Sequence, residues 1–451
     1  LLAGDAGIKA GSRITALRWY VQAWFAEEVD RSRLSRRIAA ARPAVTPQGE
    51  RMLVREVMPR NHNDSTLLAL LQWDTENGSE EKNRPDSMRR TKSTVQIRET
   101  MRIAAALPLR QTDERRAAIV RDLRDGMLAG LDVHRRKQNN NRDAIDISFE
   151  LIDSTDKDSL RHALTRLERD QNALLLFGGA FSDDADRVCR NAAERGMLVL
   201  VPMATAEDLT EYGTNIFQLN IPILQRARFL ADYAALELNA SKAFILAPDH
   251  SYAREMAETF IARCGIVGIE VLQSVYYDKS AQGIKDLCRS LSQHDVKNGI
   301  LFAPVQHRHD IVAVLEGIRE TSLTMPIIGG GNWNHPDLLK RMSHEITLYF
   351  ETDVVTDSST AEYRLLRDAF AGRSSRMLTR EALFGYDAMK IALEVTDKKP
   401  YGRKSTRKRI VNVFEGLRAP VNFLHQRVNA AMNMMLCRDG TIRRLEPFHA
   451  K

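Results

Sequence analysis

The stretch Ala173-Leu-Leu-Leu-Phe-Gly-Gly-Ala-Phe-Ser182 places five apolar residues directly before two glycines and a loop that ends in a hydroxyl. A polar segment with helical spacing follows, and a second apolar run, Leu198-Val-Leu-Val201, leads into Pro202-Met-Ala-Thr205. Short apolar runs separated by an amphipathic helix are typical of buried parallel strands joined by crossover helices. This stretch therefore predicts an α/β fold built on a parallel sheet.

The same alternation continues on both sides of this stretch. We expect strands at 103–107, 145–152, 173–177, 198–201, 243–247, 269–277, 299–303 and 326–328, with amphipathic helices between them. Helices on both faces define a doubly wound architecture. Because so many strands exceed one sheet of ordinary size, the sequence predicts two doubly wound lobes.

Helical patterns without strands fill residues 1–77. Gly4, Ala16, Tyr20 and Ala23 resemble the small and aromatic positions of a tetratricopeptide unit, although a generic helical hairpin fits equally well. Residues 78–100 are polar and aperiodic, which predicts an exposed linker. The expected order is thus an all-α helical repeat, a linker, and a bilobal domain over 101–451.

Composition excludes several classes of protein. Of the 451 residues, 43% are hydrophobic and 28% charged, which excludes a mostly disordered chain, and no apolar run is long enough for a transmembrane segment. Four cysteines are too few for a disulfide scaffold, and their spacing matches no zinc site. We expect them to be small buried hydrophobes, with no disulfide and no metal.

Catalytic and nucleic-acid functions are also disfavoured. The chain has no G-x-S-x-G elbow and no G-x-G-x-x-G fingerprint, so we expect neither catalytic residues nor a nucleotide cofactor. The net charge of +7 comes from 66 basic residues interleaved with 59 acidic ones. Pro43 and Pro47 interrupt the basic helix where a recognition helix would follow, so no nucleic-acid partner is expected.

One basic run stands apart from this mixed background. Residues 398–409 carry seven lysines and arginines in twelve positions. Such a run is either the solvated start of a helix or a contact for an anionic partner, and both interpretations stay open.

Ligands of open α/β sheets bind beyond the carboxyl ends of the strands. Four predicted strand-end loops, at 107–110, 178–182, 202–205 and 329–333, offer small residues, backbone N–H groups or a hydroxyl at the start of a helix. Such loops suit a carboxylate or another anion.

Seven short motifs occur in an order that resembles the branched-chain amino-acid binding family of type I periplasmic binding proteins. The motifs are the strand from Ile103, Asp125-Gly-Met-Leu-Ala129, Leu151-Ile-Asp-Ser154, Phe177-Gly-Gly-Ala-Phe-Ser182, Val201-Pro-Met-Ala-Thr205, Asp249-His-Ser-Tyr252 and Tyr386-Asp-Ala388. The resemblance implies lobe 1 at about 101–220 and 346–425, and lobe 2 at about 221–345 and 426–451.

The resemblance also implies a ligand site between the lobes. Ser182 and Thr205 would hold a ligand carboxylate, and the carbonyl of Met203, next to Ala204, would accept from an ammonium. The rest of the expected ligand shell lies on lobe 2: Tyr252, Gln306, Asn332 and Trp333. The lobes would close over the ligand about a hinge, without covalent chemistry.

Three departures from the family pattern limit which chemical class of ligand the site could bind. Gly331 stands where the family has an acidic clamp for the ammonium, Val305 replaces an aromatic, and Ala253 replaces a glycine. An unpaired ammonium in a closed cleft would be costly. We therefore expect either a carboxylate-bearing ligand whose other end is neutral or apolar, or no ligand at all.

The predicted function is a solute-binding protein that captures a small, amino-acid-like carboxylate for an ABC transporter, with the transporter's membrane subunits as partners. The alternative is a regulatory module, because a tetratricopeptide-like segment before this fold resembles the outer-membrane activators of penicillin-binding proteins; its partner would be a cell-wall synthase. The resemblance implies a periplasmic location, with any lipid anchor carried by a segment upstream of Leu1.

Overall fold

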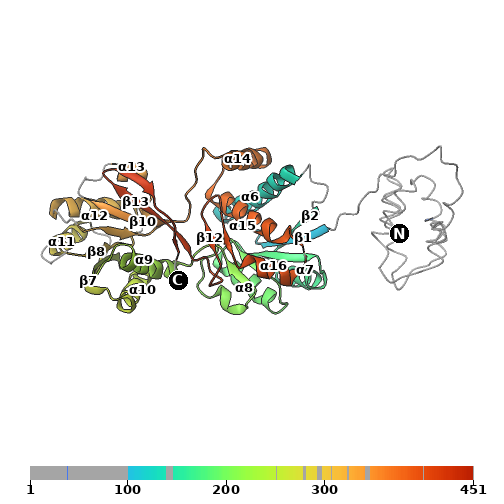
Figure 1. Ribbon diagram of the computed structural model, residues 1–451, viewed down its shortest axis with the longest axis horizontal. Helices are drawn as coiled ribbons and strands as arrows, with labels where there is room; N and C mark the ends of the chain where they lie inside the picture. The colour runs from blue at the N-terminus through green and yellow to red at the C-terminus, as the bar shows by residue number, and fades with distance from the viewer. Residues whose placement is uncertain are drawn as a thin grey trace. The chain divides into compact units, whose positions relative to one another are not determined.

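The computed structural model describes Ile38 and residues 100–138, 146–249, 251–277, 281–291, 297–305, 307–321, 325–340, 346–399 and 401–449. The predicted helical repeat and linker, apart from Ile38 and Thr100, lie outside the described residues. Residues 97–451 form one compact unit. Figure 1 shows two α/β lobes in this unit, each with its own sheet.

The first lobe is built on a parallel sheet in the order β2-β1-β3-β4-β5. Its strands are β1 (Thr100–Leu107), β2 (Asp146–Asp153), β3 (Ala173–Gly178), β4 (Val199–Val201) and β5 (Ile216–Gln218). Its helices are α6 (Glu114–Gln138), α7 (Lys157–Arg169), α8 (Ser182–Ala193), η3 (Leu209–Tyr212), α14 (Ala361–Ser374), α15 (Arg380–Thr396) and α16 (Arg403–Ile410).

Alternation along β1 explains why helices cover both faces of this sheet. Ile103 and Ala105 pack in one core with α6 and α15, whereas Ala104 and Ala106 pack in another with α7 and α8. Successive side chains of a strand point to opposite faces, so an all-apolar strand needs a helical layer on each side.

The second lobe has a mixed sheet in the order β14-β13-β10-β9-β8-β6-β7, with β15 paired to β13. Its strands are β6 (Lys242–Pro248), β7 (Glu270–Tyr277), β8 (Gly299–Phe302), β9 (Ile327–Gly329), β10 (Thr347–Thr352), β13 (Ala431–Arg438), β14 (Thr441–Arg444) and β15 (Phe448–His449). Its helices are α9 (Ile223–Leu236), α10 (Ser251–Val267), α11 (Ala281–Leu291), α12 (Arg308–Thr321), η4 (Gly331–Trp333) and α13 (Pro336–Leu339). Helices α9 and α10 cover one face, and α11 and α12 the other. A short hairpin, β11 (Val413–Phe414) with β12 (Val421–Asn422), completes the described strands.

The α/β class with two lobes is therefore confirmed; the first sheet is parallel as predicted, and antiparallel pairing of β13 with β10, β14 and β15 makes the second sheet mixed. The four cysteines are buried and free. One lobe boundary was placed too early. The chain was expected to return to lobe 1 at residue 346, but β10 pairs with β9 and β13 in the second sheet. Leu348 and Phe350 are fully buried in that lobe's core, so the return follows Thr352.

Candidate functional site

A cavity of about 650 Å³ lies where the two lobes meet. Its lining includes Thr205 and Asn220 from the carboxyl ends of the first sheet and Tyr252 from α10. The second lobe adds the loop after β9 and the end of β10, and the start of α15 borders the remaining side. The cavity thus occupies the place where an α/β sheet binds its ligand.

A buried ion pair forms one wall of this cavity. Arg226, in the first turn of α9, donates from Nη1 to both carboxylate oxygens of Glu351, at 3.0 and 3.1 Å. The same guanidinium donates to the carbonyl of Ile221 and to Oδ1 of Asn220. Only 11% of the Arg226 side chain and 4% of the Glu351 side chain are exposed. Burial disfavours the charge of Arg226, but the carboxylates of Glu351 and Asp353 raise its pKa.

Glu351 stands beside Gly331. The backbone N–H of Gly331 donates to Oε1 of Glu351 at 2.9 Å. The expectation that no counter-charge lies at Gly331 is therefore wrong, because β10 supplies a carboxylate from twenty residues further along the chain. That carboxylate is already compensated by Arg226. Its signal in the sequence is a lone acidic residue at the end of the apolar stretch Leu348-Tyr-Phe350.

Asp353 extends this charge network toward the first lobe. Arg380, the first residue of α15, forms an ion pair with Asp353, and Arg226 lies 3.8 Å away on the other side. Arg418 donates to the backbone carbonyl of Asp353. Burial opposes the charge of Asp353, but hydrogen bonding and attraction from Arg380 hold its pKa below the usual range. The segment after β10 is thus held by ionic contacts from both lobes.

The Tyr386-Asp387-Ala388 motif has a structural role in this network. Asp387 is fully buried and accepts hydrogen bonds from the backbone N–H groups of Leu417, at 2.6 Å, and Arg418, at 3.0 Å. Burial raises the pKa of Asp387 to about 6, against the opposing charge of Arg418. We define the hinge charge network as six residues: Arg226, Glu351, Asp353, Arg380, Asp387 and Arg418.

Three of the predicted site residues meet in the cavity. Thr205, Tyr252 and Asn332 all line it, and the two hydroxyls and the amide they offer come from both lobes. Tyr252 is half-buried, and its pKa is raised first by burial and then by the charge of Glu351. Gln306 lies outside the described residues.

Met203 and Ala204 do not line the cavity, because their carbonyls are engaged within the first lobe. Asn220 donates from Nδ2 to the Met203 carbonyl at 2.8 Å, and Gln218 donates from Nε2 to the Ala204 carbonyl at 2.9 Å. These amides fix the backbone of the loop and thereby position Thr205. The Met203 carbonyl, expected to accept from an ammonium, thus already accepts one hydrogen bond and does not line the cavity.

Ser182 begins α8 and is half-buried, but it does not line the cavity. Its loop is held by Asp184, whose carboxylate accepts from the Ser154 hydroxyl and from the Ala180 N–H. Gly179 adopts a φ of 70°, and a Cβ there would lie 2.5 Å from the backbone of Ala185. Only glycine therefore allows this close turn between β3 and α8.

Trp333 requires a correction. It was expected to cover the ligand, but its side chain has no exposed surface and belongs to the core of the second lobe. The indole donates from Nε1 to the Ala303 carbonyl at 2.8 Å. A Cβ on Gly329 would lie 2.0 Å from the indole, so this glycine leaves space for the ring. A large apolar ring in this loop is more stable in the core than at the polar cavity.

Within the part of the chain that the structure describes, no group of three or more His, Cys, Asp or Glu side chains is arranged to hold a metal ion. The charged groups at the cavity instead form ion pairs with one another. The arrangement is therefore suited to reversible binding by hydrogen bonds.

The family model described as "Periplasmic binding protein" matches residues 126–441, and the chain belongs to this family. Members are solute-binding proteins, not enzymes, and the family implies a periplasmic or other extracytoplasmic location. Among the described residues, no helix combines the length and apolar character needed to cross a membrane. A comparison with curated proteins finds no match.

Solved structures share this fold. A candidate branched-chain amino acid ABC transporter protein from Rhodospirillum rubrum is 16% identical, with a TM-score of 0.62, and the match covers 77% of this chain and 100% of that one. An ABC transporter substrate-binding protein from Desulfitobacterium hafniense, in complex with Leu, is 17% identical, with a TM-score of 0.51 and the same coverages. A substrate-binding protein from Sphaerobacter thermophilus is 18% identical, with a TM-score of 0.51, and covers 78% of this chain and 98% of that one.

Proposed function

We propose that this protein captures a small carboxylate-bearing ligand of amino-acid size between its two lobes and delivers it to an ABC transporter. The observation that carries the proposal is the cavity between the lobes, where Thr205 from one lobe faces Tyr252 and Asn332 from the other. The Desulfitobacterium protein of the same fold is described with leucine bound, which supports a ligand of this size.

The carboxylate would be bound by the Thr205 hydroxyl at the carboxyl end of the first sheet, with Ser182 joining when the lobes close. Hydroxyl and backbone N–H donors suit an anion in a partly buried site, because charge-assisted hydrogen bonds are stronger than neutral ones. Thr205 lines the cavity and Ser182 does not, so Thr205 is the principal donor.

The charged side chains that would surround the other end of the ligand are already paired with one another. Glu351 accepts two hydrogen bonds from Arg226 and one from Gly331, and Asp353 is paired with Arg380. A carboxylate accepts about four hydrogen bonds in all, so Glu351 has little capacity left for a ligand ammonium. The structure therefore favours a ligand whose second end is neutral or apolar over a zwitterion.

Two isosteric ligands test this proposal. Leucine and 4-methylpentanoate share their carbon skeleton and carboxylate, but only leucine carries an ammonium. We expect 4-methylpentanoate to raise the melting temperature at least as much as leucine, because bound ligand stabilises the folded state. Stabilisation by leucine alone would show that Glu351 is free to bind an ammonium.

Substitution of the two hydroxyls completes the test. Thr205→Ala should weaken binding of the best carboxylate by about 1.5–3 kcal/mol, or roughly tenfold to a hundredfold. Ser182→Ala should weaken it less. Calorimetry measures both affinities, with circular dichroism as the check on folding. Equal affinities for wild type and Thr205→Ala would show that the ligand carboxylate does not bind at Thr205.

The regulatory alternative stays a prediction, because its tetratricopeptide-like segment lies outside the described residues. We propose the transporter's membrane subunits as the partner, since the similar structures are described as ABC transporter proteins. A lipid anchor is likewise an expectation, tested by mass spectrometry of the protein isolated from membranes.

A further inference from the structure

The basic run at 398–409 divides into residues that hold the fold and residues that do not. Arg403 donates to the carbonyls of Ala173, at 2.9 Å, and Asp170, at 3.0 Å, and Arg409 donates to the carbonyl of Val395 at 2.9 Å. These two guanidiniums fasten α16 to the first lobe. The remaining cations of the helix need another explanation.

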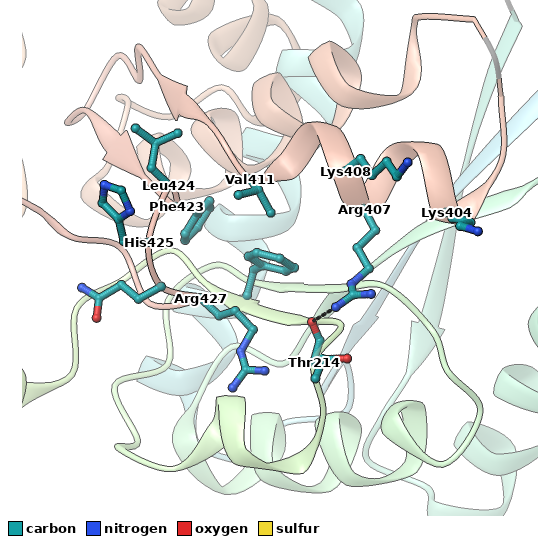
Figure 2. Close-up of a pocket in the computed structure, with 11 residues that line it drawn as sticks. Thr214, Lys404, Arg407, Lys408, Val411, Phe423, Leu424, His425 and Arg427 are labelled. Carbon is teal, nitrogen blue, oxygen red and sulfur yellow. Dashed lines mark hydrogen bonds between the residues drawn. The ribbon is translucent and has the colours of Figure 1, made fainter.

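Lys404, Arg407 and Lys408 are exposed and follow one another at helical spacing, and Val411 comes one further turn along. Residues three and four apart share one side of a helix. All four line a second pocket, of about 390 Å³ (Figure 2). This pocket shares no lining residue with the cavity between the lobes.

The floor of this second pocket is aromatic. Phe217 of β5 and Phe423 contact each other edge to face, with ring centroids 5.4 Å apart. Val411 and Leu424 border the floor and are 44% and 46% exposed. Figure 2 places Val411 and Phe423 between α16 and the returning segment that carries His425 and Arg427. Phe217 and Phe423 are only 2% and 1% exposed, so the accessible apolar surface of the pocket comes mainly from its aliphatic edges, which suit an apolar ligand body.

The rim of the pocket is cationic. Arg407 donates to the Thr214 carbonyl at 3.3 Å, and Arg427 to the Gly213 carbonyl at 3.4 Å. Within the described ranges, no carboxylate lies within ion-pair distance of Lys404, Arg407, Lys408 or Arg427. The pocket therefore combines an apolar floor with a positive rim.

We propose that this pocket is a second ligand site, for an organic anion with an apolar body, such as an aromatic carboxylate or sulfonate. The anionic group would lie against the cations of α16 and Arg427, and the apolar body against Val411 and Leu424, which border the buried rings of Phe217 and Phe423. A volume of about 390 Å³ falls within the range of small-molecule sites, roughly 300–1,000 Å³. The proposal does not depend on the ligand of the cavity between the lobes.

Calorimetry with naphthalene-2-sulfonate on the full chain tests this site, with naphthalen-2-ylmethanol as the neutral control of similar shape. We expect the sulfonate to bind and the alcohol to bind at least about tenfold more weakly. Binding should weaken when NaCl rises from about 50 to about 500 mM. Equal binding of the two probes would overturn the proposal.

Matched variants locate the site. Lys404→Gln/Arg407→Gln/Lys408→Gln should reduce sulfonate affinity by about tenfold or more. Arg115→Gln/Arg121→Gln/Lys157→Gln removes the same charge from exposed positions on the same lobe and should leave the affinity unchanged. An equal loss in both variants would show non-specific attraction to a basic protein. Lys408→Glu is a single-site reversal that gives the same answer should the triple variant fail to fold.

Two further outcomes decide against the proposal. If Thr205→Ala abolishes sulfonate binding, the probe occupies the cavity between the lobes. If a glutamate-rich hexapeptide binds and the sulfonate does not, the surface recognises an acidic protein segment.

Discussion

The two pockets of this protein treat charge in opposite ways. In the cavity between the lobes, Arg226 and Arg380 are paired with Glu351 and Asp353. The second pocket, which lies beside α16, is called the α16 pocket here. Its Lys404 and Arg407 side chains are exposed to solvent and have no carboxylate partner among the described residues. Paired buried charges hold a backbone in place, whereas unpaired exposed charges are available to an incoming anion. The paired charges therefore hold the segment after β10 in place, and the unpaired charges are available to attract a ligand.

The largest effect is expected from breaking the buried pair. Arg226→Met leaves the Glu351 carboxylate buried without its partner and should lower the free energy of unfolding by about 3–5 kcal/mol. The double variant Arg226→Met/Glu351→Leu removes both charges and should recover at least half of that loss, since a well-packed apolar pair can replace an ion pair. Urea unfolding at neutral pH measures both. A loss below about 1 kcal/mol in the single variant would mean that the pair does not hold the hinge.

The next effect concerns pH and the most deeply buried acid of the network. The pKa of Asp387 is raised to about 6 in the folded protein, from an ordinary value near 3.8. The folded state therefore binds this proton more tightly than the unfolded state, so the stabilisation is complete below about pH 4 and is lost as the pH rises through about 6. Between these limits the contribution is about 3 kcal/mol.

Asp387→Asn removes this titration. The unfolding free energy of the variant minus that of wild type should shift by about 3 kcal/mol in favour of the variant between about pH 4 and pH 7. Urea unfolding across this range measures the difference, and the titrations of all other groups cancel in it. A difference that does not change with pH would show that Asp387 keeps an ordinary pKa.

The smallest effect is expected at the α16 pocket. Lys404→Gln/Arg407→Gln/Lys408→Gln should change the free energy of unfolding by no more than about 0.5 kcal/mol, because exposed charges without a carboxylate partner contribute little to stability. Any gain should be larger at low salt, since removing like charges relieves repulsion. Thermal unfolding at two salt concentrations, with the Arg115/Arg121/Lys157 variant as control, measures it. A loss of several kcal/mol would place these side chains among the structural contacts of the fold.

The site shows where sequence reasoning stops. Thr205 follows a predicted strand end, and parallel strands bring their carboxyl ends to one edge, so its place could be predicted from the sequence pattern. Tyr252 was expected only because its turn resembles that of the branched-chain amino-acid binding family. Glu351 and Arg226 were missed because their significance depends on pairing between β10 and α9, which lie 125 residues apart. Trp333 was misassigned because its loop position does not reveal on which side the ring lies.

The sequence by itself determined the α/β class, the two lobes and most of the strands up to 326–328, because short apolar runs and helical spacing are local signals. Strand β5 was missed, and the predictions did not extend to β10 or β13. Only the tertiary structure decided which charges are compensated. Whether a lysine or carboxylate meets a partner depends on contacts between distant segments, and its surroundings set its effective charge. The same basic run therefore contains both the arginines that bind α16 to the first lobe and the cations that line its pocket.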